Sequence, residues 1–66
     1  MDINNTFTYH SPKNDQPERY ENIRENAKLL ANIINDLCPD SAEKTIAFRK
    51  LQECVMYANA SIAINE

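Results

Sequence analysis

Two basic residues four positions apart, Arg24 and Lys28, are the first feature of this sequence that could perform chemistry. Residues at that spacing share one face of a helix, where like charges repel each other slightly. An arginine offers paired N–H donors to a phosphate, and a lysine acts as a point charge. The pair therefore predicts a small phosphate-binding site. A solvated helix face with ion pairs to Glu21 and Glu25 is the alternative interpretation.

Aromatic and amide side chains could complete such a site. Tyr9 and His10 lie close together near the N-terminus, and rings of this kind stack on nucleobases. Asn59 is the one strongly polar side chain within the apolar segment 55–64, so its amide must find a partner. We predict that it contacts a base edge or a ribose; a hydrogen bond across a subunit interface is the alternative. Met56, one turn earlier, is expected to help enclose the ligand.

The candidate residues do not make a catalytic or metal centre. They include no nucleophile paired with a base and no two poised carboxylates. The single His and the two Cys lack the spacing of metal ligands. The sequence also has no Gly, which phosphate-binding loops require where the backbone approaches the ligand. We therefore predict a binding protein that is not an enzyme and needs neither metal nor cofactor.

Capping signals indicate two helices that position these residues. Asp15 and Glu18 fit a capping box at the start of the first helix, and Pro39 ends it. The second helix follows at once, with Asp40 and Glu43 as its predicted capping box and Ser41 as the alternative cap. Each helix should contain about 22–24 residues, or roughly 33–36 Å at 1.5 Å per residue.

Apolar residues recur at alternating steps of three and four in both predicted helices, a pattern typical of helices packed lengthwise. The positions are Tyr20, Ile23, Ala27, Leu30, Ile34 and Leu37 in the first helix, and Phe48, Leu51, Val55, Ala58 and Ile62 in the second. Equal helices with a short link predict an all-α fold, an antiparallel hairpin that forms a single domain over residues 15–66. Residues 1–14 are predicted to be an extended aromatic arm, with a frayed terminus as the alternative.

The hairpin should be incomplete as a monomer. A chain of 66 residues buries only ~60% of its unfolded surface. The segment 55–64 is apolar on nearly every side, and Leu29 with Ile33 adds a second stripe to the first helix. Cys38 and Cys54 would lie ~20 Å apart, too far for a disulfide, and we expect Cys54 to be a small buried hydrophobic residue. We therefore predict a homo-oligomeric helical bundle.

Charge and hydropathy exclude two classes of partner. The net charge of −3 and the pI near 5.0 argue against a nucleic acid polymer, because such proteins usually carry a basic stripe. No apolar run approaches the ~20 residues of a membrane span. The N-terminus has no signal-peptide pattern, so we expect a cytoplasmic protein.

Five segments together resemble one known family. They are FTYHSP at 7–12, YENIR at 20–24, AKLLA at 27–31, CPDSAEK at 38–44 and LQECVMYANASIA at 51–63. This pattern is similar to the hairpin domain shared by the phage anti-CBASS and anti-Thoeris cyclic-nucleotide sponges. The turn at 38–44 and the ANASIA sequence are its most specific parts.

The resemblance implies a homohexamer in the host cytoplasm that sequesters cyclic di- or trinucleotides or cyclic ADP-ribose isomers without cleaving them. CBASS or Thoeris effectors would then not be triggered. It also implies an aromatic residue of the N-terminal region acting with a cation of the first helix, roles that Tyr9 and Arg24 or Lys28 fit by position. The expected ligand-binding residues are Tyr9, His10, Arg24, Lys28, Met56 and Asn59. The alternative function is a homo-oligomeric interaction module that docks a host or phage protein.

Overall fold

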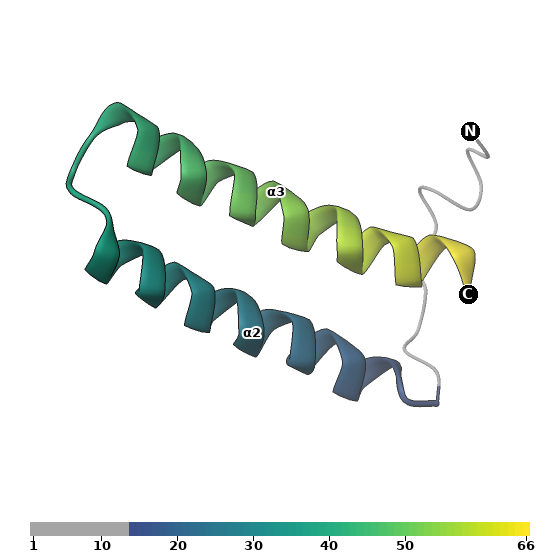
Figure 1. Ribbon diagram of the computed structural model, residues 1–66. Coiled ribbons are helices and arrows are strands. Elements are labelled where there is room, and N and C mark those ends of the chain that lie inside the picture. The colour runs from purple at the N-terminus through teal and green to yellow at the C-terminus, as the bar shows by residue number, and fades with distance from the viewer. Residues whose placement is uncertain (1–13) are drawn as a thin grey trace.

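The computed structural model describes residues 14–66, which form two helices. Helix α2 (Gln16–Leu37) and helix α3 (Ala42–Asn65) run antiparallel and side by side (Figure 1). They contain 22 and 24 residues, which confirms the predicted hairpin and its helix lengths. The predicted aromatic arm, apart from Asn14, lies outside the described residues. The division into an arm and a single hairpin domain stays a prediction.

Helix α2 begins at Asp15, but not through the predicted capping box. The Asp15 side chain accepts no capping hydrogen bond, and its carboxylate lies 3.2 Å from Arg19 Nε instead. The carbonyl of Asp15 accepts the Arg19 N–H at 3.0 Å, and Pro17 occupies the first turn, where a missing N–H costs little. The capping-box prediction was therefore wrong for this helix, because an ion pair takes the carboxylate.

Ser41, not Asp40, caps helix α3. Its Oγ accepts the backbone N–H of Lys44 at 3.1 Å, whereas Asp40 Oδ1 accepts the Lys44 ammonium at 3.1 Å. The same ammonium donates to the carbonyl of Asn35 at 3.1 Å and so ties the two helices across the turn. Cys38 is extended, with φ −106° and ψ 134°, as the steric clash before a proline requires.

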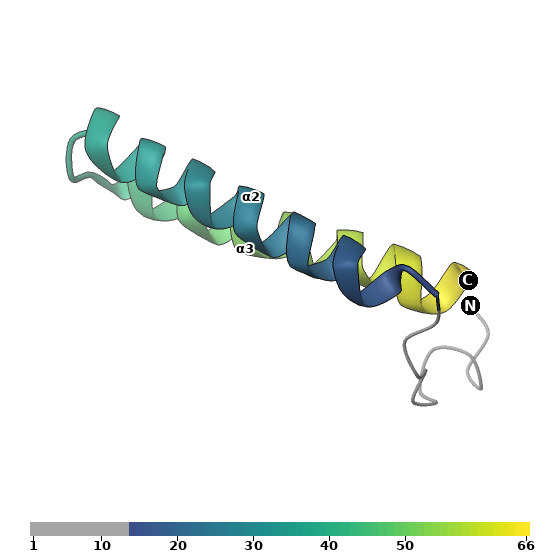
Figure 2. The ribbon, with the colours of Figure 1, turned by 90° about the horizontal axis from the view of Figure 1, so that it is seen from below.

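The interface between the helices is only half-buried. The five predicted interface residues of α3 are all partly exposed, and no apolar side chain among residues 14–66 is buried. Leu37, predicted for the interface, is 78% exposed because α2 ends there at the turn. Cys54 is exposed in the isolated chain, which contradicts the buried hydrophobic residue that we expected. The reason is that the two described helices form a single layer (Figure 2), so no further described helix packs on either face.

A polar network closes the open end of the hairpin. Arg19 Nη1 donates to Glu66 Oε2 at 2.8 Å, and Nη2 donates to the other carboxylate oxygen. Gln16, the one buried polar residue in the described range, donates to Glu66 Oε1 at 3.3 Å. The Arg19 guanidinium lowers the pKa of Glu66 to about 2, and the carboxylate raises the pKa of Arg19 in return.

Neither described helix is both long and apolar enough to cross a membrane.

Candidate functional site

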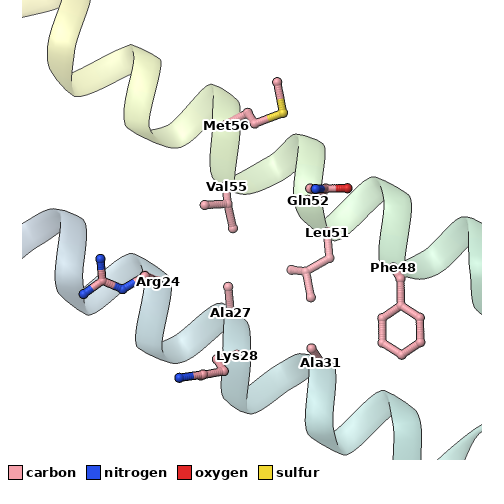
Figure 3. A pocket seen from close by; sticks show the side chains of 9 residues that line it. All are labelled: Arg24, Ala27, Lys28, Ala31, Phe48, Leu51, Gln52, Val55 and Met56. Carbon is pink, nitrogen blue, oxygen red and sulfur yellow. The ribbon is translucent and has the colours of Figure 1, made fainter.

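A groove of about 340 Å³ runs along one face of the hairpin (Figure 3). Its lining residues come from both helices: Arg24, Ala27, Lys28 and Ala31 from α2, and Phe48, Leu51, Gln52, Val55 and Met56 from α3. We call it the cationic groove, after the two basic residues on its α2 side. Its volume is within the range of small-molecule sites in proteins.

The floor of the cationic groove is apolar because the helix–helix interface forms it. Leu51 and Val55 point from α3 toward Ala27 and Ala31 on α2 (Figure 3). Both alanine side chains end at Cβ, so they leave space that larger residues at these positions would fill. The interface pattern that makes the hairpin thus also produces the depression.

The cations at the α2 edge lack close carboxylate partners. Arg24 Nε lies 3.8 Å from Glu25 Oε1, a long ion pair on an exposed surface. Lys28 makes no ion pair with any residue of the described range, and neither does Glu21, one of the carboxylates suggested as a neutralising partner. None of the groove-lining residues within 14–66 is acidic. The α2 edge therefore presents positive charge beside an apolar floor, a combination suited to a phosphate ester of an aromatic base.

Residues of α3 form the opposite wall. Met56, which the sequence placed near Arg24, does line the groove and is 62% exposed. Phe48 and Gln52 also line it, and the sequence analysis did not assign them to the site. They stand at steps of four before Met56, so extending that spacing along α3 could have found both. Gln52 is exposed, and its amide bonds to nothing within residues 14–66.

Asn59 does not line the cationic groove, although it lies on the same side of α3, three residues beyond Met56. Its Oδ1 is buried and accepts no hydrogen bond from the described part of the chain. An enclosed acceptor without a donor costs roughly 1–3 kcal/mol. A donor from a ligand or from a second subunit would remove that cost, so both interpretations of Asn59 remain predictions.

Two predicted ligand residues, Tyr9 and His10, lie outside the described residues, and their roles stay predictions. No cluster of three or more metal-binding side chains occurs within residues 14–66.

A second groove, of about 270 Å³, lies on the other side of the helix–helix interface. It shares Ala27, Leu51 and Val55 with the cationic groove, and its remaining lining residues are Ile23, Asn26, Leu30, Cys54 and Ala58. None of these residues is charged. Helical periodicity places three large exposed side chains next to this second groove. They are Leu29 and Ile33 on α2, and Tyr57 on α3. We call the second groove with these three residues the apolar face.

The family comparison agrees with this architecture. A family model described as the Acb2/Tad1 hairpin domain matches residues 1–63 of the chain. The chain belongs to this family. Membership confirms the resemblance drawn from the five sequence segments, and the two helices form the hairpin that the description of the Acb2/Tad1 domain names. Neither a curated protein nor a solved structure matches the chain significantly.

Proposed function

We propose that the protein sequesters cyclic nucleotide immune signals in the host cytoplasm and thereby keeps CBASS or Thoeris effectors inactive. The observation that carries this proposal is the positive edge formed by Arg24, which has only the 3.8 Å ion pair with Glu25, and by Lys28, which has none within residues 14–66; this edge lies beside the apolar floor of the cationic groove. Membership of the Acb2/Tad1 hairpin family supports a sequestering role. The ligand classes are cyclic di- or trinucleotides and cyclic ADP-ribose isomers.

Each part of the groove has a role in this proposal. The Arg24 guanidinium and the Lys28 ammonium bind phosphate oxygens, and Ala27, Leu51 and Val55 contact the apolar surface of sugar and base. Gln52 offers an unpaired amide to a base edge. The predicted stacking by Tyr9 and His10, and the predicted contact with Asn59, would enclose the remaining ligand surface.

The groove binds without turnover in this proposal. Within residues 14–66, its lining residues include no Ser, Thr, Cys or His that could serve as nucleophile or base, and no carboxylate. We therefore expect the ligand to be released intact when the protein is unfolded.

A second copy of the chain is the proposed partner of the apolar face. Leu29 is 59% exposed and Tyr57 75% exposed, and the second groove between the helices carries no charge that would need solvent. Because no apolar side chain of the described range is buried, the hairpin gains most of its apolar burial by association. The homohexamer expected from the family resemblance is the assembly that we propose.

Binding measurements on two variants test this function. Wild-type protein should show a ligand-induced rise in thermal midpoint with at least one member of a panel of cyclic di- and trinucleotides and cyclic ADP-ribose isomers. Arg24→Ala and Lys28→Ala each remove a charged hydrogen bond worth roughly 1.5–3 kcal/mol, so their affinity should fall about tenfold or more. Lys50→Ala, which removes a cation paired with Glu53 at 3.4 Å, is the matched control and should bind normally.

Three results would contradict this proposal, and each would lead to a different conclusion. Full affinity in both groove variants would reject the cationic groove as the site. A stable multimer whose thermal midpoint ignores the whole panel would reject sequestration and favour the module that docks a host or phage protein. Ligand recovered in cleaved form would show an enzyme.

A further inference from the structure

One more basic residue, Arg49, stands on the groove side of α3 by helical periodicity, although it does not itself line the cationic groove. It precedes Gln52 by three residues and Met56 by seven, so all three lie on one side of the helix. Gln52 and Met56 line the groove, as does Phe48, the neighbour of Arg49 in sequence. The contacts of Asn35 with Lys44 and of Gln16 with Glu66 define which residues are level across the hairpin. Interpolation between these two contacts places Arg49 at about the same height along the hairpin as Ala31, which lines the groove from α2.

The basic residues of the described range divide into two sets. Three have a carboxylate oxygen within 3.4 Å: Arg19, Lys44 and Lys50. The other three are Arg24, with its 3.8 Å contact to Glu25, and Lys28 and Arg49, which form no ion pair within residues 14–66. The neutralised set is spread along the hairpin, whereas Arg24 and Lys28 line the cationic groove and Arg49 stands on the same side of α3 as its residues Gln52 and Met56. Clustering of like charges costs free energy that a bound anion would recover.

The three cations do not surround one point. Arg24 and Lys28 stand on α2, whereas Arg49 stands on α3, and packed helix axes are about 8–10 Å apart. One phosphate at the α2 edge therefore leaves Arg49 without a partner. A ligand that carries a second phosphate on the opposite side of its ring would satisfy it.

We propose that Arg49 is a third ligand-binding residue, which contacts a second phosphate from the α3 side of the cationic groove. This inference rests on the proposed function and deepens it. It selects, among the cyclic messengers, those whose two phosphates are separated around a ring, as in a cyclic dinucleotide. A cyclic ADP-ribose isomer carries its two phosphates joined as a pyrophosphate, which Arg24 and Lys28 would bind without Arg49.

The test compares Arg49→Gln with Lys50→Gln, a matched loss of charge at the next residue. The probes are cyclic di-AMP, cyclic di-GMP and cyclic GMP-AMP, with cyclic AMP as a probe that has a single phosphate. For the cyclic dinucleotide that wild type binds most tightly, Arg49→Gln should lower the affinity about tenfold or more, and Arg49→Lys should restore part of it. Lys50→Gln should bind like wild type. Any binding of cyclic AMP should be unaffected by Arg49→Gln.

Salt provides a second readout, because the loss of an exposed charge contact makes binding less sensitive to ionic strength. The affinity of Arg49→Gln for the dinucleotide should therefore decline less with added salt than that of wild type. The variant should keep the wild-type mass by light scattering, since Arg49 is exposed and has no described partner.

Each remaining outcome overturns the inference. Equal affinity in Arg49→Gln and Lys50→Gln would show that Arg49 contacts no phosphate, while sequestration by the groove would stand. Equal losses for cyclic AMP and for the dinucleotide would show a general field effect and no second phosphate site. If the wild-type protein binds cyclic ADP-ribose isomers but no cyclic dinucleotide, the proposed role of Arg49 is overturned and the proposed sequestration stands. Wild type that binds no member of either panel would overturn the proposed function with it.

Discussion

At the scale of single residues, the clearest electrostatic feature is Glu66 at the open end of the hairpin. Its carboxylate accepts hydrogen bonds from Arg19 and Gln16, and Arg19 is the main reason that its pKa falls from 4.5 to about 2. A carboxyl whose pKa is lower in the folded state stabilises the fold while it is ionised. That contribution is complete above about pH 4.5 and disappears as the pH falls toward 2.

Acid should therefore loosen the open end, and Glu66→Gln should remove part of this effect. We expect the difference in thermal midpoint between pH 7 and pH 3 to be smaller in Glu66→Gln than in wild type, measured by circular dichroism at one protein concentration. Asp36→Asn is the control, because Asp36 is exposed and has no ion pair within residues 14–66. An unchanged pH response in Glu66→Gln would mean that the Arg19–Glu66 contact adds no stability in solution.

Sequence reasoning found some groove residues and missed others for physical reasons. Arg24, Lys28 and Met56 could be placed together because helix periodicity and one turn position determine which residues are level in a hairpin. The absence of an ion pair at Arg49 within residues 14–66, from which its proposed role is argued, could not be predicted, because the i,i+4 spacing equally allows Arg49 to pair with Glu53. In the structure Glu53 contacts Lys50 instead. Competition between neighbours for one carboxylate depends on side-chain conformations, which sequence spacing does not determine.

At the scale of elements, the start of α3 shows how local competition decides a cap. Asp40 and Ser41 are both good N-cap residues, and the capping box predicted from Asp40 and Glu43 was wrong, because Ser41 is the cap. The ammonium of Lys44 decides between them, because that group bonds to Asp40 and to the carbonyl of Asn35 across the turn. Ser41 then remains to accept the Lys44 N–H. The existence of the helix could be predicted from periodicity. The identity of its cap could not, because it depends on where the neighbouring helix lies.

Substitutions at the two candidate caps should differ in their effect on stability. Ser41→Ala removes the capping acceptor and should lower the free energy of unfolding by about 0.5–2 kcal/mol. Asp40→Ala removes an ion pair whose carboxylate is fully exposed, and such pairs contribute about 0–1 kcal/mol. Urea denaturation at equal protein concentration measures both values. A larger loss in Asp40→Ala than in Ser41→Ala would contradict this assignment of the cap.

At the scale of the whole molecule, residues 14–66 form a single layer with a differently lined groove on each face. One face carries the cationic groove, and the other carries uncharged lining residues with large exposed side chains beside them. The sequence predicted an incomplete monomer from the segment 55–64. It did not reveal the separation of the faces, because that depends on which side of the interface each helix position occupies. The structure places Leu29 and Ile33 away from Arg24 and Lys28.

An acidic residue on the apolar face should therefore dissociate the assembly. Ile33→Asp would place a charge where the second copy is proposed to dock, so the mass by light scattering should fall toward the 7.6 kDa of one chain. Helicity should fall as well, because the described hairpin buries no apolar side chain by itself. Met56→Asp makes the same change on the opposite face and should keep the oligomer while it weakens ligand binding. An unchanged mass in Ile33→Asp would exclude this face as the contact between copies.

The three side chains shared by the two grooves, Ala27, Leu51 and Val55, have a further consequence. They act as a partition only one residue thick, so residues 14–66 contain no interior that could insulate the two surfaces from each other. If a second copy docks on one side as proposed, a shift of Leu51 or Val55 would change the shape offered on the other side. Assembly and ligand binding would then be thermodynamically linked, each strengthening or weakening the other by the same factor.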